Sequence, residues 1–220
     1  MRELQERVRS ERIKESARPA GKPGSRVRER DMPLRNILFV HPGEEGIDCR
    51  GEVHQYFQAA EKVEQTVSKQ DYLRRQQNLN PQVFRLLNQG YPRSFYNGNG
   101  AVSRHGCVVL SADGSRAEIP NSQENRKVYG ESGNQYGKGV ARANISVLCD
   151  VYNRFIVDLG IHKYRDSEIE EAKGHIERMR EALGERSVLI ICDRNYVSLE
   201  FLNYLENAGV KYLIRLHKGD

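Results

Sequence analysis

The chain has 220 residues, a formal net charge of +5 and 38% hydrophobic residues, enough to bury one sizeable core and a smaller helical one. No apolar run approaches the roughly 18 residues that span a membrane, and the mixed-charge N-terminus lacks the apolar segment of a secretory signal. The four cysteines lie far apart without a Cys-x-x-Cys spacing, which argues against structural zinc and favours free thiols in a reducing cytoplasm.

The excess positive charge lies at the N-terminal end. Residues 1–36 hold 11 Lys/Arg against 6 Asp/Glu, and the remainder balances at 24 against 24. A basic arm of this kind suits a polyanionic partner, although a solvated tail has the same composition, so charge alone leaves both interpretations open. We expect residues 1–30 to form a basic, flexible arm.

Helix-type spacing fills residues 31–98. Leu34, Ile37 and Leu38 form a first apolar stripe, and a second helix is expected over 53–60. Ser68 is placed to cap a third helix, Lys69–Gln77, which should turn Tyr72 and Leu73 inward and Arg74 and Arg75 outward. Asn80-Pro81 opens a fourth helix, and the period changes to that of a strand after Tyr91-Pro92 and the glycine-rich 97–100.

This small all-helical domain is compatible with two roles. Three or four short helices with basic residues could read DNA in the manner of a helix-turn-helix protein, with Lys69, Arg74 and Arg75 as candidate contacts. The same spacing also fits a plain structural bundle, and the sequence leaves the choice open.

Strand-type patterns begin near residue 107. The apolar run Val108–Leu110 leads into Ala112-Asp113-Gly114-Ser115, where Asp-Gly is also a strong signal for a hairpin turn. A polar loop is expected over 121–138. The runs 140–149 and 154–161 then flank a second hairpin turn at 150–153, in which Asp150 is expected to act as a turn residue.

The C-terminal part alternates between helix and strand. Acidic residues open a helix at Asp166-Ser167-Glu168, and Gly184 ends it. Val188–Cys192 is a continuous apolar strand followed by Asp193, Ser198 caps the next helix, and 210–216 is a last strand. The order predicts a mixed sheet covered by helices, of α/β class. The scattered histidines are expected in surface or core roles.

Two buried strands that each end in an aspartate can bring two carboxylates to one edge of a sheet. Carboxylate pairs of this kind hold hard divalent cations through oxygen ligands. Taken singly, Asp113 could merely make a turn and Asp193 could merely cap the helix after its strand. Both at once favour a metal site.

Several segments together carry a family resemblance. They are Leu110–Ser115, Ile119–Ser122 with Tyr129-Gly130, Ala143–Asn153, Cys192–Tyr196 and Gly209–Arg215, preceded by Met32–Leu34, Val67–Gln70 and Leu79–Pro81. In this order they resemble the DDE transposases of bacterial insertion sequences, of the cut-and-paste branch with a β-rich insertion. The resemblance implies a ribonuclease-H-like catalytic domain over 99–220, preceded by the helical domain of 31–98.

The resemblance also implies a chemistry. Asp113 and Asp193 match the first two acidic residues of the metal-binding triad, which holds two Mg²⁺ or Mn²⁺ ions for hydrolysis and strand transfer at DNA ends. Arg194 and Tyr196 match positions beside the second aspartate and are expected to contact phosphate or pack the site, while Asn195 replaces a glycine usual there. The implied partner is DNA, bound by a homodimer in a synaptic complex. The implied location is the bacterial cytoplasm, in association with the nucleoid.

The family takes its third acid, a glutamate, from a helix beyond the last strand recognised here. Glu200 and Glu206 are too close to Asp193 in sequence to replace it. The sequence therefore predicts a truncated and inactive or weakly active transposase portion. The alternatives are a non-catalytic DNA-binding protein that interferes with an intact transposase, and an ordinary ribonuclease-H-like nuclease.

Overall fold

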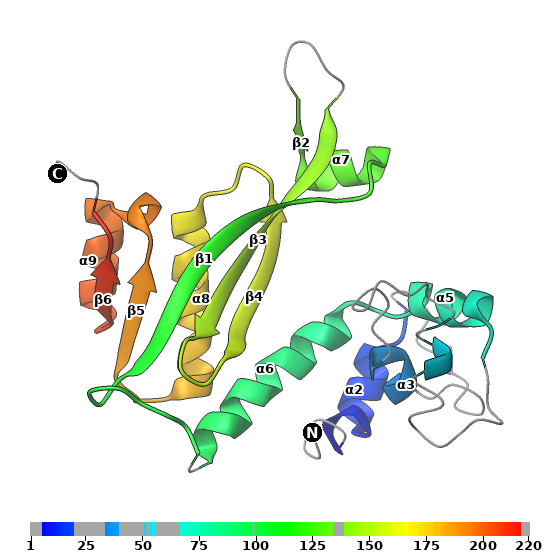
Figure 1. Ribbon diagram of the computed structural model, residues 1–220, viewed down its shortest axis with the longest axis horizontal. Helices are drawn as coiled ribbons and strands as arrows, with labels where there is room; N and C mark the ends of the chain where they lie inside the picture. Colours follow the sequence, from blue (N-terminus) through cyan, green and yellow to red (C-terminus); the bar gives the residue numbers. More distant parts are fainter. Residues whose placement is uncertain are drawn as a thin grey trace. The chain divides into compact units, whose positions relative to one another are not determined.

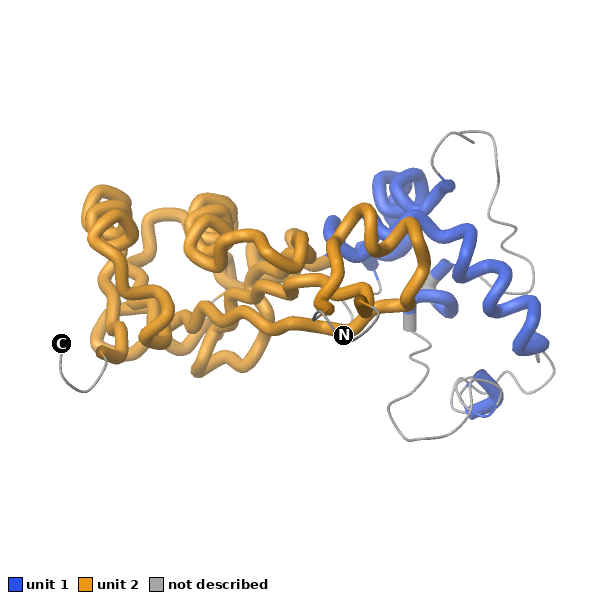
Figure 2. Tube along the Cα trace, turned by 90° about the horizontal axis from the view of Figure 1, so that it is seen from above, with its two compact units in different colours: residues 1–87 blue, residues 88–220 orange. Residues whose placement is uncertain are grey.

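The chain forms two compact units, Met1–Leu87 and Asn88–Asp220 (Figure 2). The computed structural model describes residues 6–19, 34–39, 51, 53–55, 67–98, 100–133 and 139–216. The division falls inside one helix, α6 (Gln82–Asn97). Among the described residues, no helix is long and apolar enough to cross a membrane.

The first unit is helical. It contains α2 (Glu11–Ser16), α3 (Leu34–Phe39), α5 (Lys69–Gln77) and the start of α6. Its core consists of the apolar residues Val8, Ile13, Ala17, Leu34, Leu38, Val83 and Leu87. Residues 53–55 are helical, and the rest of the helix expected over 53–60 lies outside the described residues.

Helix α5 has the predicted bounds and the predicted cap. The Ser68 hydroxyl accepts a hydrogen bond from the Asp71 N–H at 3.1 Å, which satisfies one of the free donors of the first turn. Tyr72 is fully buried, as expected, but Leu73 is 36% exposed. Neighbouring helical residues point about 100° apart, so the two side chains cannot share one narrow apolar stripe.

Helix α6 continues through Pro92 and ends at Asn97, at the start of the glycine-rich segment after which the structure was expected to change. A proline inside a helix removes one backbone hydrogen bond and normally ends or kinks it. The last turn is held by its side chains instead. Tyr96 is 1% exposed, and its ring and that of Phe95 pack against Phe155, with centroids 5.7 and 4.9 Å away.

The second unit is built on a mixed sheet (Figure 1). Its strands are β1 (Val108–Glu118), β2 (Glu131–Ser132), β3 (Val140–Asp150), β4 (Phe155–Lys163), β5 (Val188–Cys192) and β6 (Lys211–Ile214). The main order is β4-β3-β1-β5-β6, and the short β2 pairs the first residues of β3. β3 pairs antiparallel with both β1 and β4. On the other side of β1, β5 and β6 continue the sheet parallel to β1. This is the ribonuclease-H-like arrangement, and it confirms the predicted fold class.

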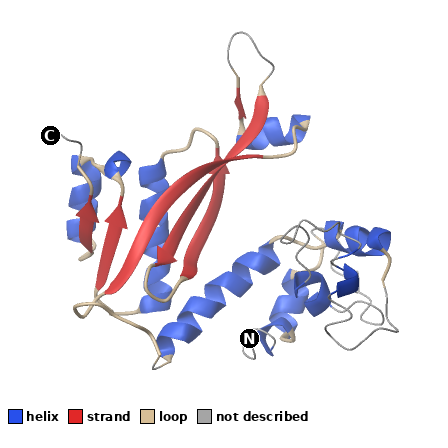
Figure 3. Cartoon of the chain, in the orientation of Figure 1, coloured by secondary structure: helices blue, strands red, loops and turns tan. Residues whose placement is uncertain are grey.

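Helices α8 (Glu168–Leu183) and α9 (Leu199–Asn207) cover one face of this sheet (Figure 3). The inward stripe of α8, Ala172, Ile176, Met179 and Leu183, joins alternate residues of the central strands in one core. Helix α8 begins and ends as predicted, with acidic residues in its first turn and Gly184 after its last residue. Ser167 caps its start, and Gly184 has a φ of 61°.

Strand β1 runs straight through Asp113-Gly114, so the hairpin turn that this dipeptide signals is not formed. Its pairing with β3 is continuous from Leu110 opposite Asp150 to Glu118 opposite Arg142. Pairing with a long antiparallel neighbour satisfies every second backbone group and outweighs the local turn preference. The expected end of the strand at Asp113 is therefore wrong.

The segment expected as a polar loop over 121–138 contains a helix, α7 (Gln123–Tyr129), and the short β2. The Ser122 hydroxyl caps α7 by accepting a hydrogen bond from the Asn125 N–H at 3.1 Å. Residues 134–138 lie outside the described part of the chain. With no buried residue, α7 has no apolar stripe to reveal it in the sequence.

The hairpin between β3 and β4 is confirmed, and Asp150 acts in its turn. One carboxylate oxygen accepts hydrogen bonds from the backbone N–H groups of Tyr152 and Asn153, at 3.1 and 2.8 Å. The other accepts from the Tyr96 hydroxyl at 2.5 Å and from the Asn153 side-chain amide at 2.8 Å. Asp150 is 1% exposed, so this aspartate anchors the turn to α6 within the core.

Candidate metal centre

The two candidate aspartates follow the paired part of two neighbouring strands. β1 and β5 are parallel and paired up to Ser111 opposite Ile191. Asp113 lies two residues further along β1, and Asp193 lies two residues beyond Ile191, directly after the end of β5. Neighbouring strands lie roughly 4.8 Å apart and aligned residues of parallel strands project to the same side, so both carboxylates can reach one ion.

The local backbone holds each aspartate in place. Asp113 follows Ala112, which packs in the core under α8, so the alternation of the strand turns Asp113 toward the other face. Asp193 ends β5 and caps the short 3-10 helix η1 (Arg194–Tyr196), where its carboxylate accepts a hydrogen bond from the Asn195 N–H at 2.8 Å. Both side chains are exposed, and each keeps oxygen lone pairs free for a ligand.

Negative charge accumulates around Asp113 and Asp193, a region called the aspartate rim below. The pKa of the Tyr196 hydroxyl is raised, first by burial and then by the charges of Glu168, Cys192, Asp113 and Asp193. Burial raises the pKa of Cys192 to about 12, with a further contribution from Asp193. A phenol surrounded by carboxylates keeps its proton, and the same concentration of negative charge attracts a divalent cation.

Glu168 is a carboxylate next to Gly114, on the face of the sheet that α8 covers. A methyl group built on Gly114 would meet the Glu168 side chain at 3.3 Å, so this side chain lies directly over the glycine. Glu168 stands in the first turn of α8, where a carboxylate is favoured by the free N–H groups of the helix. In the sequence, Glu168 is recognisable only as an acid that opens a helix.

The residues expected beside Asp193 differ in their exposure. Arg194 is exposed in η1 and available to a phosphate. Tyr196 is 2% exposed and packs near Phe201, with ring centroids 6.0 Å apart. Of the two expected roles of Tyr196, its position favours packing of the site over phosphate contact.

The three candidate DNA contacts of the helical unit lie on α5. Arg74 is exposed, whereas Arg75 is partly buried and its Nε donates to the Asp71 carboxylate at 3.0 Å. Lys69 is the first residue of the helix. These residues belong to the first compact unit.

A second polar group, absent from the predicted site, lies between α8 and strands β3 and β4. The Ser146 hydroxyl contacts His175 Nε2 at 2.6 Å, and His175 Nδ1 contacts the Asp158 carboxylate at 2.6 Å. Arg178 also donates to Asp158, at 2.7 Å. The order serine, histidine, aspartate is that of a hydrolase triad, but all three residues are at most 5% exposed, so no substrate can reach the hydroxyl. The group ties the helix to the sheet.

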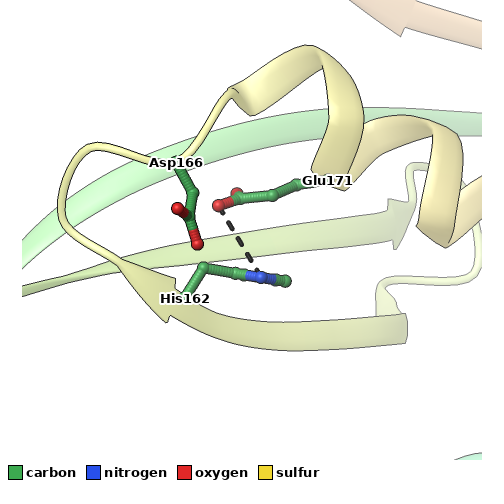
Figure 4. A group of neighbouring side chains, drawn as sticks. All are labelled: His162, Asp166 and Glu171. Carbon is green, nitrogen blue, oxygen red and sulfur yellow. Dashed lines mark ion pairs between the residues drawn. The ribbon is translucent and has the colours of Figure 1, made fainter. Parts of the chain in front are cut away.

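Beside this network, three potential metal ligands converge (Figure 4). They are His162 at the end of β4, Asp166 before α8 and Glu171 in its first turns, and their nearest ligand atoms all lie within 4.8 Å of one another. His162 Nδ1 is 3.8 Å from Glu171 Oε1. Two features of the sequence could have indicated this cluster. One is the set of polar residues on the inward side of α8, and the other is the pair of alternating polar residues in β3, Asn144 and Ser146.

The fold defines a class, a ribonuclease-H-like domain, with one exposed aspartate in β1 and one directly after β5. The family model described as the transposase DDE domain matches residues 105–220, just over half of the chain. The chain therefore belongs to the transposase DDE domain family. Among curated proteins, no sequence matches it.

Solved structures of related architecture were also compared. The catalytic domain of Mos1 mariner transposase aligns with a TM-score of 0.36 and 10% identity, covering 60% of this chain and 59% of that chain. The piggyBac transposase in a synaptic complex with hairpin DNA gives 0.35 and 12%, covering 70% and 34%. A chain of the simian T-cell lymphotropic virus intasome, in complex with PP2A regulatory subunit B56 gamma, gives 0.36 and 13%, covering 76% and 51%. The chain thus matches less than two thirds of the length of each of these proteins.

Proposed function

We propose that the chain acts on DNA as part of a metal-dependent transposase of bacterial insertion sequences, with Asp113 and Asp193 as metal ligands. The observation that carries this proposal is the parallel pairing of β1 with β5 up to Ser111 and Ile191, two residues before each aspartate, within a member of the transposase DDE domain family. The substrate is the phosphodiester backbone at the ends of the element, and the reactions are hydrolysis followed by strand transfer.

The donor set fits the ions that this chemistry uses. Asp113 and Asp193 offer exposed carboxylate oxygens, the ligands preferred by Mg²⁺ and Mn²⁺, in a region where the charges around Tyr196 are already negative. When bound, two such ions would activate a water or a 3′-hydroxyl and stabilise the leaving oxygen. The exposed Arg194 is suited to hold the phosphate through its guanidinium group.

Two carboxylates hold a divalent ion less firmly than three. We therefore propose that this chain associates with DNA, binds metal weakly through Asp113 and Asp193 and cleaves strands little or not at all, and that full activity requires a further carboxylate. The helical unit, with Lys69, Arg74 and Arg75 on α5, is proposed to contribute DNA contacts, and a homodimer at the bacterial nucleoid is the proposed working form.

The test is a nicking assay on supercoiled plasmid with the purified chain in Mg²⁺ or Mn²⁺. Weak nicking that disappears in Asp113→Asn and Asp193→Asn, but persists in the exposed control Glu206→Gln, supports the proposal. Metal-dependent nicking that survives in both aspartate variants refutes the assigned ligands. DNA binding without any nicking in either ion points to the alternative, a non-catalytic protein that interferes with an intact transposase, and co-expression with such a transposase then measures the interference.

A further inference from the structure

The cluster of His162, Asp166 and Glu171 offers a ligand set different from that of the aspartate rim. It combines one imidazole nitrogen with two carboxylates, drawn from β4, the turn after it and α8. Imidazole suits Zn²⁺, Cu²⁺, Fe²⁺ and Ni²⁺, whereas Mg²⁺ and Mn²⁺ prefer oxygen ligands. The chemistry of the cluster therefore selects a transition ion.

The geometry is close to that of a metal site. Ligand atoms bound to one such ion at about 2.1 Å lie at most about 4.2 Å apart. The ligand atoms of the cluster lie within 4.8 Å of one another, so they need to move only slightly closer together to bind an ion. Asp166 can supply that movement, because it is exposed and its carboxylate is held by one backbone hydrogen bond, from the Lys163 N–H at 3.0 Å. His162 presents Nδ1 to Glu171, at 3.8 Å.

A buried amide next to the cluster points to a missing ligand. Asn144 stands opposite His162 in the β3–β4 pairing, is 2% exposed and donates its Nδ2 to both oxygens of Glu171, at 3.2 and 3.1 Å. Its Oδ1 is buried and finds no hydrogen-bond donor among the described residues. A buried acceptor without a partner is unfavourable, and an ion-bound water or the ion itself would satisfy it.

The cluster is reached from solvent. Asn144 and Asp166 line one cavity of about 370 Å³, together with Arg116, Tyr164, Arg165 and Glu168. The Arg116 guanidinium lies over the Tyr164 ring, 5.3 Å from its centroid. Two arginines on the cavity wall, Arg116 and Arg165, repel any divalent cation, so binding at the cluster depends on the bonds from its ligand atoms.

The Glu171 carboxylate is buried and is contacted by the Asn144 amide and by His162 Nδ1. A divalent cation between Glu171 and Asp166 would offset the repulsion between the two carboxylates.

We propose that His162, Asp166 and Glu171 bind one first-row transition-metal ion, separate from the Asp113–Asp193 rim, with Asn144 as an outer or additional oxygen ligand. The ion would link the end of β4 to the first turns of α8, beside the buried contacts of His175 with Ser146 and Asp158. Its role is to fix the junction of strand and helix.

The test uses the full chain, stripped with a chelator and titrated with Zn²⁺, with bound metal counted by mass spectrometry and the site probed by the visible spectrum of Co²⁺. His162→Gln and Asp166→Asn should each weaken Zn²⁺ binding at least about tenfold, the loss that even outer-shell substitutions produce. The exposed neighbour Glu170→Gln should leave it unchanged. Asp166→Asn keeps the protein foldable, because that side chain is exposed.

Asp113→Asn and Asp193→Asn separate this site from the proposed catalytic one. Both variants should retain the Zn²⁺ site and the Co²⁺ spectrum while losing Mg²⁺- or Mn²⁺-dependent activity. Equal Zn²⁺ affinity in the wild type, His162→Gln and Asp166→Asn would overturn the inference, as would loss of the Zn²⁺ site in the two aspartate variants. Either result would mean that the ion binds elsewhere.

Discussion

Asp113 in β1 and Asp193, directly after β5, each lie two residues beyond Ser111 and Ile191, the last paired residues of these parallel strands. Asp113 lies within a strand that continues to Glu118, and Asp193 caps a short helix after its strand has ended. Each local structure is complete without a metal. In the proposed function, the pairing of β1 with β5 brings the two carboxylates to one ion.

The hydrogen bond between Tyr96 and Asp150 is expected to stabilise the second unit. Tyr96→Phe removes a buried donor 2.5 Å from a carboxylate, which should lower the free energy of unfolding by about 2 kcal/mol. Urea denaturation measures the change. Tyr91→Phe is the matched control, since Tyr91 is 38% exposed and should tolerate the loss of its hydroxyl, and equal stability of the two variants would contradict the expectation.

Asp158 should make the second unit sensitive to acid. Burial alone would raise the pKa of this carboxyl, but hydrogen bonds and charges from His175 and Arg178 outweigh burial and lower it. A lowered folded-state pKa stabilises the protein above the ordinary aspartate value of roughly 3.9, and this stabilisation is lost as the pH falls toward the folded value.

The variant Asp158→Asn tests this dependence. It should lower the free energy of unfolding near neutral pH by about 3 kcal/mol, the lower end for a broken buried pair, because the Arg178 side chain is 35% exposed. The difference from the wild type should shrink below about pH 4 in urea denaturation series. A difference that stays constant with pH would show that the charge of Asp158 is unimportant.

Glu171 should have the opposite pH dependence. Its pKa is raised, chiefly by burial, so the folded protein favours the protonated carboxyl and ionisation costs stability as the pH rises through the folded value. Glu171→Gln keeps an oxygen for the Asn144 amide but carries no charge. In a chelating buffer, its melting temperature should exceed that of the wild type near pH 8 and match it near about pH 4. A lower melting temperature than the wild type near pH 8 would contradict this assignment.

The elements predicted correctly from the sequence are those whose own residues determine them. Helix α8 has an acidic start, a regular apolar stripe and a glycine after its end, and the run Val188–Cys192 can bury both faces of a strand. Local rules failed where distant contacts decide. Asp113-Gly114 is drawn into β1 by pairing with β3, and Pro92 stays within α6 because Tyr96 is anchored in the core.

The candidate sites also differ in whether the local sequence indicates them. Asp113 and Asp193 could be predicted as a site because each follows an apolar strand run, and parallel strands align such residues. The cluster of His162, Asp166 and Glu171 was not, since its members come from a strand, a turn and a helix whose packing fixes their distances. A buried polar residue on a helix, such as His175, cannot be told by spacing alone from a solvated one.

The most direct measurement of the central claim is Mn²⁺ binding by the wild type, Asp113→Asn, Asp193→Asn and the double variant, followed by electron paramagnetic resonance. If both carboxylates hold the same ion, each single variant should lose nearly as much affinity as the double variant, because the two ligands act as a unit. Independent, additive losses from the two substitutions, or binding unchanged in either single variant, would contradict a shared site at the rim of β1 and β5.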